Sequence, residues 1–586
     1  MKYLLFVLFL FLSNLSFSQI ILEGKVVDAK TNEPLAFCNV AIKGSTRGFN
    51  SNEEGKYRIS ISSESDSLIF SYIGYKTLIL IGSDLRRNTL VGLQVNNVGL
   101  QEAHIVANDP FLYEALDKCR KKIIGSKPQS SKAYFQLQTD IQNQAVEMLE
   151  CYYNASLKGS AIQELLLKNG RIGLAETKDH GFFTSLNTSR AISYLDLVKQ
   201  NEYLPSLPLQ FKLSKLKKQF YLKKIGEDAS SYQIEFTPIK NKRSCFYGQV
   251  WIDKQTYAIL NITLNIENAF IHPFMPAYPG SRMDSVCMNI TQSYNLSEKA
   301  NSLNHINFNY RFRFHNGMPY SRLNNGSTDG YSVSTSGALF FYDYHTLFVL
   351  PYFTYDENES DYRKITAMPY DDFFWKNNKE LLLTDKQQQS LDFFNKNGLL
   401  INYTNKKSKL KGNYNVFKAN NIIWSDTTRV ALNKDNLDSL LQKDYLFNKN
   451  GQYFISDLCK LNVQIYLSLN PSKDSIQHSS ATIFDIAQSY YHLPIEPYSN
   501  CFLNIYFDLC EIERRNMEMT LQLRAWSLPE MDSIYQQTVA NLKQQTKDYL
   551  KDVQLGQNTK ELLKWNAYVL EKLAIDNAKL FAIEKE

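Results

Sequence analysis

Between residues 20 and 106, apolar and polar residues alternate with a period of two in short runs. Turn sequences separate these runs at residues 31–34 (TNEP), 43–45 (KGS) and 52–55 (NEEG). Proline fixes one backbone angle in such turns, and glycine adopts conformations that larger residues resist. Short strands at this spacing, with no helical stretch between them, predict an antiparallel β-sandwich of about seven or eight strands.

A helical period replaces the alternation at residues 110–124 (PFLYEALDKCRKKII). One face of this helix carries Phe111, Ala115, Leu116 and Cys119. Basic residues near its end suit the negative end of the helix dipole. The pattern predicts a helical connector within residues 107–130.

Longer alternating stretches follow between residues 131 and 355. The segment GQVWIDKQTYAILNITL (248–264) is typical of a hairpin, and Asn169-Gly170 predicts another because this pair readily forms a type I′ turn. The first hairpin is similar to strands of periplasmic lipoprotein-carrier-like sheets, although any wide antiparallel meander has the same pattern. The region predicts one large antiparallel sheet with one buried and one hydrated face.

Residues 356–480 carry a mixed pattern, which predicts linker and helical segments. An aromatic cluster at residues 369–375 (PYDDFFW) precedes a helical stretch at 381–394. These aromatic side chains suit packing inside a core, and the alternative is a stacking platform for a sugar.

Residues 481–586 are typical of a helical bundle. One helix is expected to begin at Ser499 or Asn500, and the next begins with Ser527-Leu-Pro-Glu530, a capping box with proline in the first turn. Leu555-Gly556 marks the end of that second helix. The last helix has a broad apolar stripe, which indicates a face that packs against a core.

The first 18 residues (MKYLLFVLFLFLSNLSFS) combine a positive charge at Lys2, an apolar run from Tyr3 to Leu12, and small residues at Ser16 and Ser18. This order of features is typical of a cleaved secretory signal peptide. A membrane-spanning helix needs roughly 20 apolar residues, so the run is too short to be one. The sequence predicts export to the periplasm or the outer membrane, with no transmembrane helix in the mature chain.

Composition narrows the class of protein further. The chain has 586 residues, of which 44% are hydrophobic and 21% charged, as expected for a globular protein of several domains. A net charge of +6 is mild for this length, and an exported protein is not expected to bind nucleic acid. The eight cysteines form no CxxC pair, so they suit buried packing better than a zinc ribbon or a redox motif.

Motifs of the common hydrolases and nucleotide-binding proteins are absent from the sequence. None of the eight histidines has a glutamate three residues later, and no two histidines lie within four positions. His305 and His315 flank one predicted strand and would need a turn to meet. GxSxG, GxxxxGK[ST] and GxGxxG do not occur either. The sequence therefore assigns no catalytic, cofactor-binding or metal-binding residue, and no cofactor is expected.

A set of residues in the N-terminal region resembles the carboxypeptidase-regulatory-like domain, over about residues 20–106. The matching positions are Gly24, Val26, Asp28, Thr31, Pro34, Leu35, Val40, Ile42, Gly44, Glu54, Gly55, Tyr57, Ile59 and the run Tyr72-Ile73-Gly74-Tyr75. The resemblance implies a transthyretin-like sandwich that acts as a non-catalytic folding or interaction module. It also implies an envelope protein of the Bacteroidetes type.

Together these patterns predict an α+β multidomain chain, divided as signal peptide 1–18, sandwich 20–106, connector 107–130, sheet domain 131–355, mixed segment 356–480 and helical domain 481–586. Two functions stay open. The first is a non-enzymatic envelope protein that binds or scaffolds a protein or glycan partner. The second is an envelope hydrolase acting on glycan or peptide from the middle sheet, because a glycosidase can carry its two carboxylates far apart in sequence.

Aromatic residues of the middle region are candidates for the partner surface, since aromatic side chains are enriched in interface cores. They are Tyr342, Tyr344, Tyr352 and Phe353. The alternative is that the sheet needs them for its own core.

We expect the mature protein to begin at Gln19, because Ser16 and Ser18 occupy the −3 and −1 positions of the cleavage site. The intact mass of the protein purified from its native cells measures this directly. A mass that includes Met1 would contradict the prediction.

Overall fold

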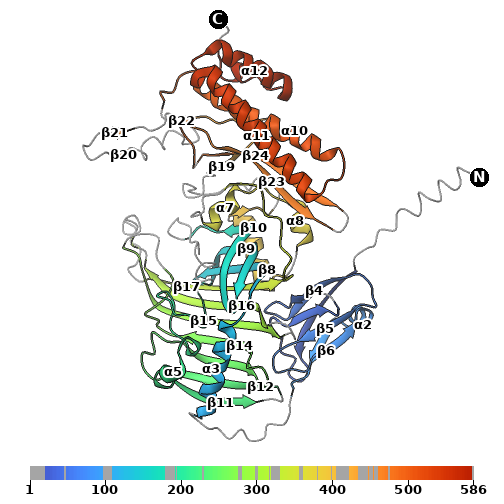
Figure 1. The fold of residues 1–586 in the computed structure, drawn as a ribbon, viewed down its shortest axis with the longest axis vertical. Helices are drawn as coiled ribbons and strands as arrows, with labels where there is room; N and C mark the ends of the chain where they lie inside the picture. Colours follow the sequence, from blue (N-terminus) through green and yellow to red (C-terminus); the bar gives the residue numbers. More distant parts are fainter. Residues whose placement is uncertain are drawn as a thin grey trace, which may run out of the picture. The chain divides into compact units, whose positions relative to one another are not determined.

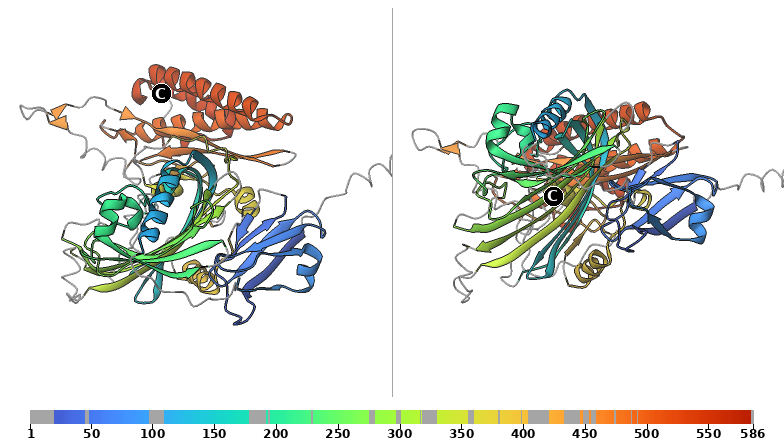
Figure 2. Two further views of the ribbon diagram at one scale, coloured as in Figure 1. Left: turned by 60° about the horizontal axis from the view of Figure 1, so that its bottom comes forward. Right: turned by 90° about the horizontal axis from the view of Figure 1, so that it is seen from below.

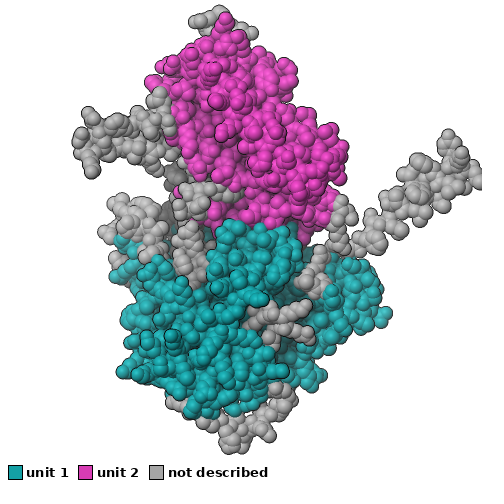
Figure 3. All heavy atoms as spheres, viewed as in Figure 1, with its two compact units in different colours: residues 1–166, 173–347, 378–398 teal, residues 167–172, 348–377, 399–586 magenta. Residues whose placement is uncertain are grey.

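The computed structural model describes residues 20–44, 48–96, 109–177, 192, 195–227, 230–274, 280–296, 301–315, 317, 330–354, 360–378, 381–397, 399–403, 421–432, 446–447, 453–454, 459–472, 475–486, 488–491 and 493–583. The predicted signal peptide lies outside the described residues. Two compact units divide the chain (Figures 1 and 3). The first unit comprises residues 1–166, 173–347 and 378–398, and the second comprises 167–172, 348–377 and 399–586.

The first unit begins with an N-terminal module built from two small sheets. One sheet has the order β4-β1-β7 and the other β3-β2-β5-β6. Their bounds are β1 Ile20–Asp28, β2 Asn39–Ile42, β3 Gly48–Asn50, β4 Lys56–Ile61, β5 Ser67–Ser71, β6 Leu78–Ile81 and β7 Leu90–Leu93. The predicted alternation is present in β4, where Tyr57, Ile59 and Ile61 are buried and the residues between them are not.

Two expectations about this module are wrong. The strands are not all antiparallel, because β1 pairs in parallel with β7. A short helix, α2 (Gly82–Arg87), also lies between β6 and β7. The two corrections have one cause, since a parallel partner can be reached only by a long crossover. Here the crossover passes through the second sheet and α2.

Ten strands, β8 to β17, form a large antiparallel sheet. Their order is β11-β12-β13-β14-β15-β16-β17-β8-β9-β10, so β8 lies beside β17 rather than at an edge. The bounds are β8 Pro128–Ile141, β9 Gln144–Lys158, β10 Ala161–Leu174, β11 Phe220–Glu227, β12 Ser231–Pro238, β13 Tyr247–Asp253, β14 Ile259–Ile266, β15 Arg282–Leu296, β16 Asn301–His315 and β17 Tyr331–Tyr342. The predicted hairpin of β13 and β14 is confirmed.

The hairpin predicted at Asn169-Gly170 is wrong. β10 runs through both residues as one strand, and the turn before it lies near Gly159, whose φ is +62°. Asn169 is fully buried, and residues 167–172 belong to the second unit. Packing of this segment therefore overrides the local turn preference of the Asn-Gly pair.

The predicted connector helix is present as α3 (Pro110–Ile124). The Asp109 side chain accepts a hydrogen bond from the Phe111 N–H at 2.9 Å and caps the helix. The Tyr113 hydroxyl donates to the Phe220 carbonyl of β11 at 3.1 Å, and the Phe111 ring lies 5.2 Å from that of Tyr232. α3 lies on one face of the sheet together with η1 (Pro208–Gln210) and α5 (Leu213–Gln219) (Figure 2).

The helix α9 (Asp385–Asn397) completes the first unit. A capping box begins it, because Thr384 Oγ1 accepts from the Gln387 N–H and the Gln387 side chain accepts from the Thr384 N–H. Its first turn contacts both the N-terminal module and the large sheet.

The second unit combines a small sheet with long helices. The sheet has the order β19-β24-β23, with β19 Asn421–Ile423, β23 Val463–Pro471 and β24 Ile476–Asp485. The helices are α7 Asp361–Ala367, α8 Asp372–Asn377, α10 Ser499–Gln522, α11 Leu528–Val553, α12 Thr559–Leu573 and α13 Asn577–Leu580. The remaining short elements are β18 Leu399–Ile401, β20 Leu446–Phe447, β21 Tyr453–Phe454, β22 Cys459–Lys460, β25 Tyr490–Tyr491 and η4 Gln554–Gly556.

The helix boundaries predicted for this unit are confirmed. Glu530 accepts from the backbone N–H of Ser527 at 2.8 Å, which is the glutamate half of a capping box, and it also accepts from the Ser527 hydroxyl at 2.7 Å. α11 ends where Gln554, Leu555 and Gly556 all have positive φ. α10, α11 and α12 share one apolar core, in which the Phe502 and Tyr549 rings stack at 5.7 Å. Among the described helices, none combines the length and apolar character needed to cross a bilayer.

Gly55 gives a test of the module's packing. Its φ is +74°, and a Cβ atom there would lie 2.4 Å from the Val26 carbonyl oxygen. Gly44 also has a positive φ, of +80°, but nothing lies within 4 Å of its Cβ position. We expect Gly55→Ala to destabilise the module by roughly 2 kcal/mol or more and Gly44→Ala by only about 1 kcal/mol. Hydrogen exchange of module peptides across a urea series measures both changes, and equal losses would contradict the packing argument.

Candidate functional site

The candidate site lies in the first unit, where the N-terminal module meets β16 and β17. We call this contact the module–sheet seam. Phe37 of the module packs its ring 5.6 Å from that of His305 and 5.7 Å from that of Phe340. Asn50 Nδ2 donates a hydrogen bond to Asn304 Oδ1 at 2.9 Å, and both side chains are buried. Apolar and polar contacts therefore hold the seam together.

The backbone of the module is adapted to present Phe37. This residue has φ +59°, a conformation that is unfavourable for a bulky side chain. The loop that follows is fixed by the Ser51 hydroxyl, which accepts from the Cys38 N–H at 2.9 Å and donates to the Leu35 carbonyl at 2.8 Å. Strain of this kind persists only where surrounding contacts enforce it.

The large sheet has a backbone irregularity at the position where it contacts the module. In β15 and β16, Ser293 pairs with His305 and Tyr294 pairs with Leu303, so Asn304 is the extra residue of a β-bulge. A bulge locally re-aims a side chain. Here it directs Asn304 to the module.

Helix α9 adds a second group of contacts between the module and the sheet. Asp385 accepts a charged hydrogen bond from Lys56 of the module at 2.7 Å, and its backbone N–H donates to Glu54 at 3.0 Å. On the other side, Lys386 pairs with Asp140 of β8 at 2.5 Å. These ion pairs are largely exposed and contribute little individually. They link the first turn of α9 to the module on one side and to β8 on the other.

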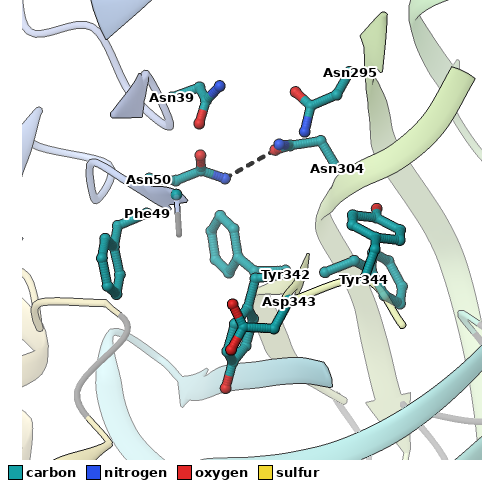
Figure 4. A pocket seen from close by; sticks show the side chains of 11 residues that line it. Asn39, Phe49, Asn50, Asn295, Asn304, Tyr342, Asp343 and Tyr344 are labelled. Atoms are coloured by element: carbon teal, nitrogen blue, oxygen red, sulfur yellow. Dashed lines mark hydrogen bonds between the residues drawn. The ribbon is translucent and has the colours of Figure 1, made fainter. Parts of the chain in front are cut away.

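A small hollow opens at the seam (Figure 4). Its volume is about 90 Å³. The module contributes Asn39, Gly48, Phe49 and Asn50, and the sheet contributes Asn295, Asn304, Phe340, Phe341, Tyr342, Asp343 and Tyr344. Figure 4 shows the labelled asparagine side chains toward one side and Phe49, Tyr342 and Tyr344 toward the other. The hollow therefore has a hydrogen-bonding side and an aromatic side.

The tight turn after β17 shapes the lower rim of the hollow. Asp343 has φ +47° and His345 has φ +68°, and the Thr346 N–H donates to the Asp343 carbonyl at 3.0 Å. The Asp343 carboxylate pairs with Lys132 at 3.0 Å. Tyr344 donates its hydroxyl to the Leu303 carbonyl, and burial raises the pKa of this phenol.

His305 is a core residue of the seam rather than a ligand or base. Its Nδ1 lies 2.7 Å from Asn304 Oδ1, which fits a neutral ring that donates from Nδ1. Burial lowers the pKa of His305 to about 3. His315, at the far end of β16, instead pairs with Asp284 at 2.7 Å. Ten strand residues separate the two histidines by roughly 33 Å, so they do not form one site.

The aromatic residues singled out in the sequence divide into two groups. Tyr342 and Tyr344 line the hollow. In the second unit, Tyr352 packs its ring 4.6 Å from that of Tyr535, and Phe353 lies 6.0 Å from Tyr466. Phe374 and Trp375 of the PYDDFFW segment are also buried, so packing is their role.

The second unit contains a buried charged cluster that no sequence pattern indicated. Lys168 is 0% exposed, and its Nζ donates to the Val349 carbonyl at 2.8 Å, to Ser468 Oγ at 3.0 Å and to the Leu469 carbonyl at 3.1 Å. Burial lowers the pKa of Lys168 to about 8, and the nearby Asp371 carboxylate opposes this effect. Three protein acceptors hold the ammonium, so the cluster ties Lys168 to the residues around Val349 and Leu469.

Metal ligands are not gathered anywhere in the described part of the chain. No group of three or more His, Cys, Asp or Glu side chains there is arranged to hold an ion. His104, His180 and His492 lie outside the described residues.

A family comparison supports the resemblance drawn from the N-terminal residues. Residues 22–105 match the family model of the CarboxypepD_reg-like domain. This confirms that the N-terminal region resembles that domain, over nearly the range inferred from residues 20–106. No curated protein matches the chain.

Solved structures with similar segments are distant in sequence. A DUF1329 family protein from Desulfovibrio piger is 10% identical and has a TM-score of 0.18, with 43% of this chain and 96% of that one covered. A LolA superfamily protein from Nitrosomonas europaea is 12% identical with a TM-score of 0.16, covering 39% and 91%. MucB in the Pseudomonas aeruginosa MucA/MucB complex is 11% identical with a TM-score of 0.13, covering 38% and 92%. Scores this low carry no argument about this chain.

Because His305 is buried in its neutral form, the free energy of unfolding is expected to depend on pH. The folded pKa of about 3 lies below the ordinary value of 6.5, so below pH 6.5 the unfolded chain takes up a proton that the folded chain refuses. The contribution of His305 to the free energy of unfolding is fully present above pH 6.5 and decreases as the pH drops toward 3. Between pH 7 and pH 5, we expect a loss on the order of 1–2 kcal/mol from this residue.

Urea unfolding at both pH values, compared between the natural protein and His305→Gln, isolates the contribution of this residue. The variant is expected to have the smaller difference between pH 7 and pH 5. His345→Gln is the control, because His345 is exposed in the turn after β17 and should keep the natural difference. An unchanged pH dependence in His305→Gln would contradict the prediction.

Proposed function

We propose that the chain is an exported, non-enzymatic protein of the cell envelope, in the periplasm or at the outer membrane, that binds or scaffolds a partner at the module–sheet seam. The N-terminal module is the interaction element in this proposal, and we infer a transthyretin-like sandwich for it. The large sheet is the platform that holds the module in one orientation. The partner is a protein or a glycan of the envelope.

One observation carries this proposal, namely that module and sheet build one shared hollow from inward-facing polar side chains of both. Asn50 and Asn304 come from different parts of the chain and are joined directly at 2.9 Å. A flexibly tethered module would not need a buried amide pair or a strained Phe37 at its contact. Rigid placement is useful when the two parts act as one binding surface.

The sequence features agree with this location and role. The leader-like pattern of residues 1–18 supports export, and the match of residues 22–105 to the CarboxypepD_reg-like domain supports an accessory rather than a catalytic module.

The alternative, a hydrolase on the middle sheet, receives less support. Glu147 and Glu150 are two carboxylates of β9, and they are only 2% and 3% exposed. Glu150 accepts from the Tyr134 hydroxyl at 2.8 Å and Glu147 from the Thr139 hydroxyl at 3.0 Å. Acid–base catalysis needs carboxyl groups that a substrate can reach, and these two are packed inside the sheet.

Affinity capture of the tagged chain from gently solubilised native envelope tests the proposal. We expect one partner to be recovered at a constant ratio, and we expect Phe37→Ala to lose it because this substitution removes the ring contacts at 5.6 and 5.7 Å. Loss of an aromatic pair weakens the seam by roughly 0.5–1.5 kcal/mol for each contact.

The matched control is Ile79→Ala, which removes an exposed apolar side chain of the same module. Capture of the partner by this variant and by the natural chain, but not by Phe37→Ala, supports the seam as the binding surface. Recovery of the chain alone, together with turnover of a glycan or peptide in an activity screen, favours the hydrolase instead.

A further inference from the structure

We infer that the hollow at the module–sheet seam binds a single neutral sugar ring of an envelope glycan. This inference rests on the proposed function and specifies the ligand class of the same site. It follows from the polar groups, the charge, the aromatic side and the size of the hollow.

The polar groups of the hollow are amides that still have hydrogen-bonding capacity. Asn50 uses its Nδ2 and Asn304 uses its Oδ1 in their mutual bond, and Asn39 Nδ2 donates to Ser71 Oγ at 3.4 Å. Among the described residues, no protein group engages the remaining side-chain oxygens of Asn39 and Asn50, the Asn304 Nδ2, or the amide of Asn295. Acceptors and donors therefore stand side by side. Neighbouring sugar hydroxyls, each a donor and an acceptor, match this arrangement.

The charge of the hollow favours an uncharged ligand. Asp343 is the charged lining residue, and Lys132 neutralises its carboxylate at 3.0 Å. A phosphate or a uronic acid would have to displace part of this ion pair or remain unpaired. A free cation would compete with Lys132 for the same carboxylate. A neutral sugar ring neither displaces this ion pair nor brings an unpaired charge into the hollow.

The aromatic side of the hollow supplies the apolar contact that a sugar ring also needs. Phe49 comes from the module, Tyr342 is the last residue of β17, and Tyr344 lies in the turn that follows (Figure 4). The C–H faces of a pyranose are apolar while its edge is polar. A site with amides on one side and rings on the other matches both surfaces.

The volume sets the size of the ligand. About 90 Å³ corresponds to roughly three water molecules, at about 30 Å³ for each. That space admits one edge of a single sugar ring and excludes an oligosaccharide. The hollow is therefore expected to receive the polar edge of one residue, with the rest of that ring and of the glycan outside it.

Titration calorimetry of the full mature chain with methyl glycosides tests the inference. The probes are methyl β-glucopyranoside, methyl α-mannopyranoside and methyl β-galactopyranoside, compared with glucuronate and with the uncharged peptide N-acetyl-trialanine amide. We expect saturable binding of at least one neutral glycoside and no binding of glucuronate or peptide. Asn295→Ala is expected to weaken the glycoside about five- to tenfold, the usual effect of losing one or two hydrogen bonds.

Two further variants make the result interpretable. Asn304→Ala should weaken binding at least as much, but it also removes the Asn50 contact, so its fold is checked by circular dichroism. Asn309→Ala is the matched control, because Asn309 is an exposed asparagine of the same strand, β16, away from the hollow. Equal affinity in Asn295→Ala and Asn309→Ala would overturn the assignment of the site.

The outcomes separate this inference from the proposed function. If partner capture depends on Phe37 but no neutral glycoside binds, the assignment of a sugar site is wrong and the proposed scaffolding role is retained. Binding of the peptide in place of glycosides also overturns the sugar assignment. If a glycoside is bound and hydrolysed, the sugar site stands and the non-enzymatic role is wrong.

Discussion

The buried hydrogen bond between Asn50 and Asn304 is the contact on which the seam depends. Both side chains are less than 10% exposed, so an unpaired amide at either position would be desolvated without compensation. The bond restrains the orientation of the module on β16, while the Phe37, His305 and Phe340 rings supply apolar area around it.

Local irregularities of the backbone make this contact possible. Asn304 faces the module because it is the extra residue of a bulge, and Phe37 reaches the sheet because its φ is +59°. Asp343 and His345 also have positive φ in the turn that borders the hollow. Each irregularity costs some free energy. Such irregularities persist where surrounding contacts enforce them, as the packing of the seam does here.

Buried polar groups recur through both units and have different roles. In the second unit, the three acceptors around Lys168 satisfy the ammonium fully, and the cluster holds residues 167–172 in place. The asparagines of the hollow are satisfied only in part by protein, and their remaining groups face a space large enough for a ligand. This difference distinguishes a structural cluster from a candidate binding site.

Elements with local signals could be predicted from the amino-acid sequence. A helical period located α3, the Ser527–Glu530 pattern located the start of α11, and a run of positive φ ends α11 at the predicted glycine. Alternation likewise located the strands of the β13–β14 hairpin and of β4. These features depend on residues a few positions apart, so a single sequence is sufficient to find them.

Features that depend on residues far apart in the chain became evident only in the folded structure. The Asn169-Gly170 pair forms no turn because its segment is buried with Lys168. The parallel pairing of β1 with β7 and the pairing of β8 with β17 join strands that are far apart in the chain. The candidate site belongs to this class, because Asn50 and Asn304 are 254 residues apart. Neither residue lies in a sequence motif. Their role in joining the module to the sheet can be recognised only from their contact in the folded structure.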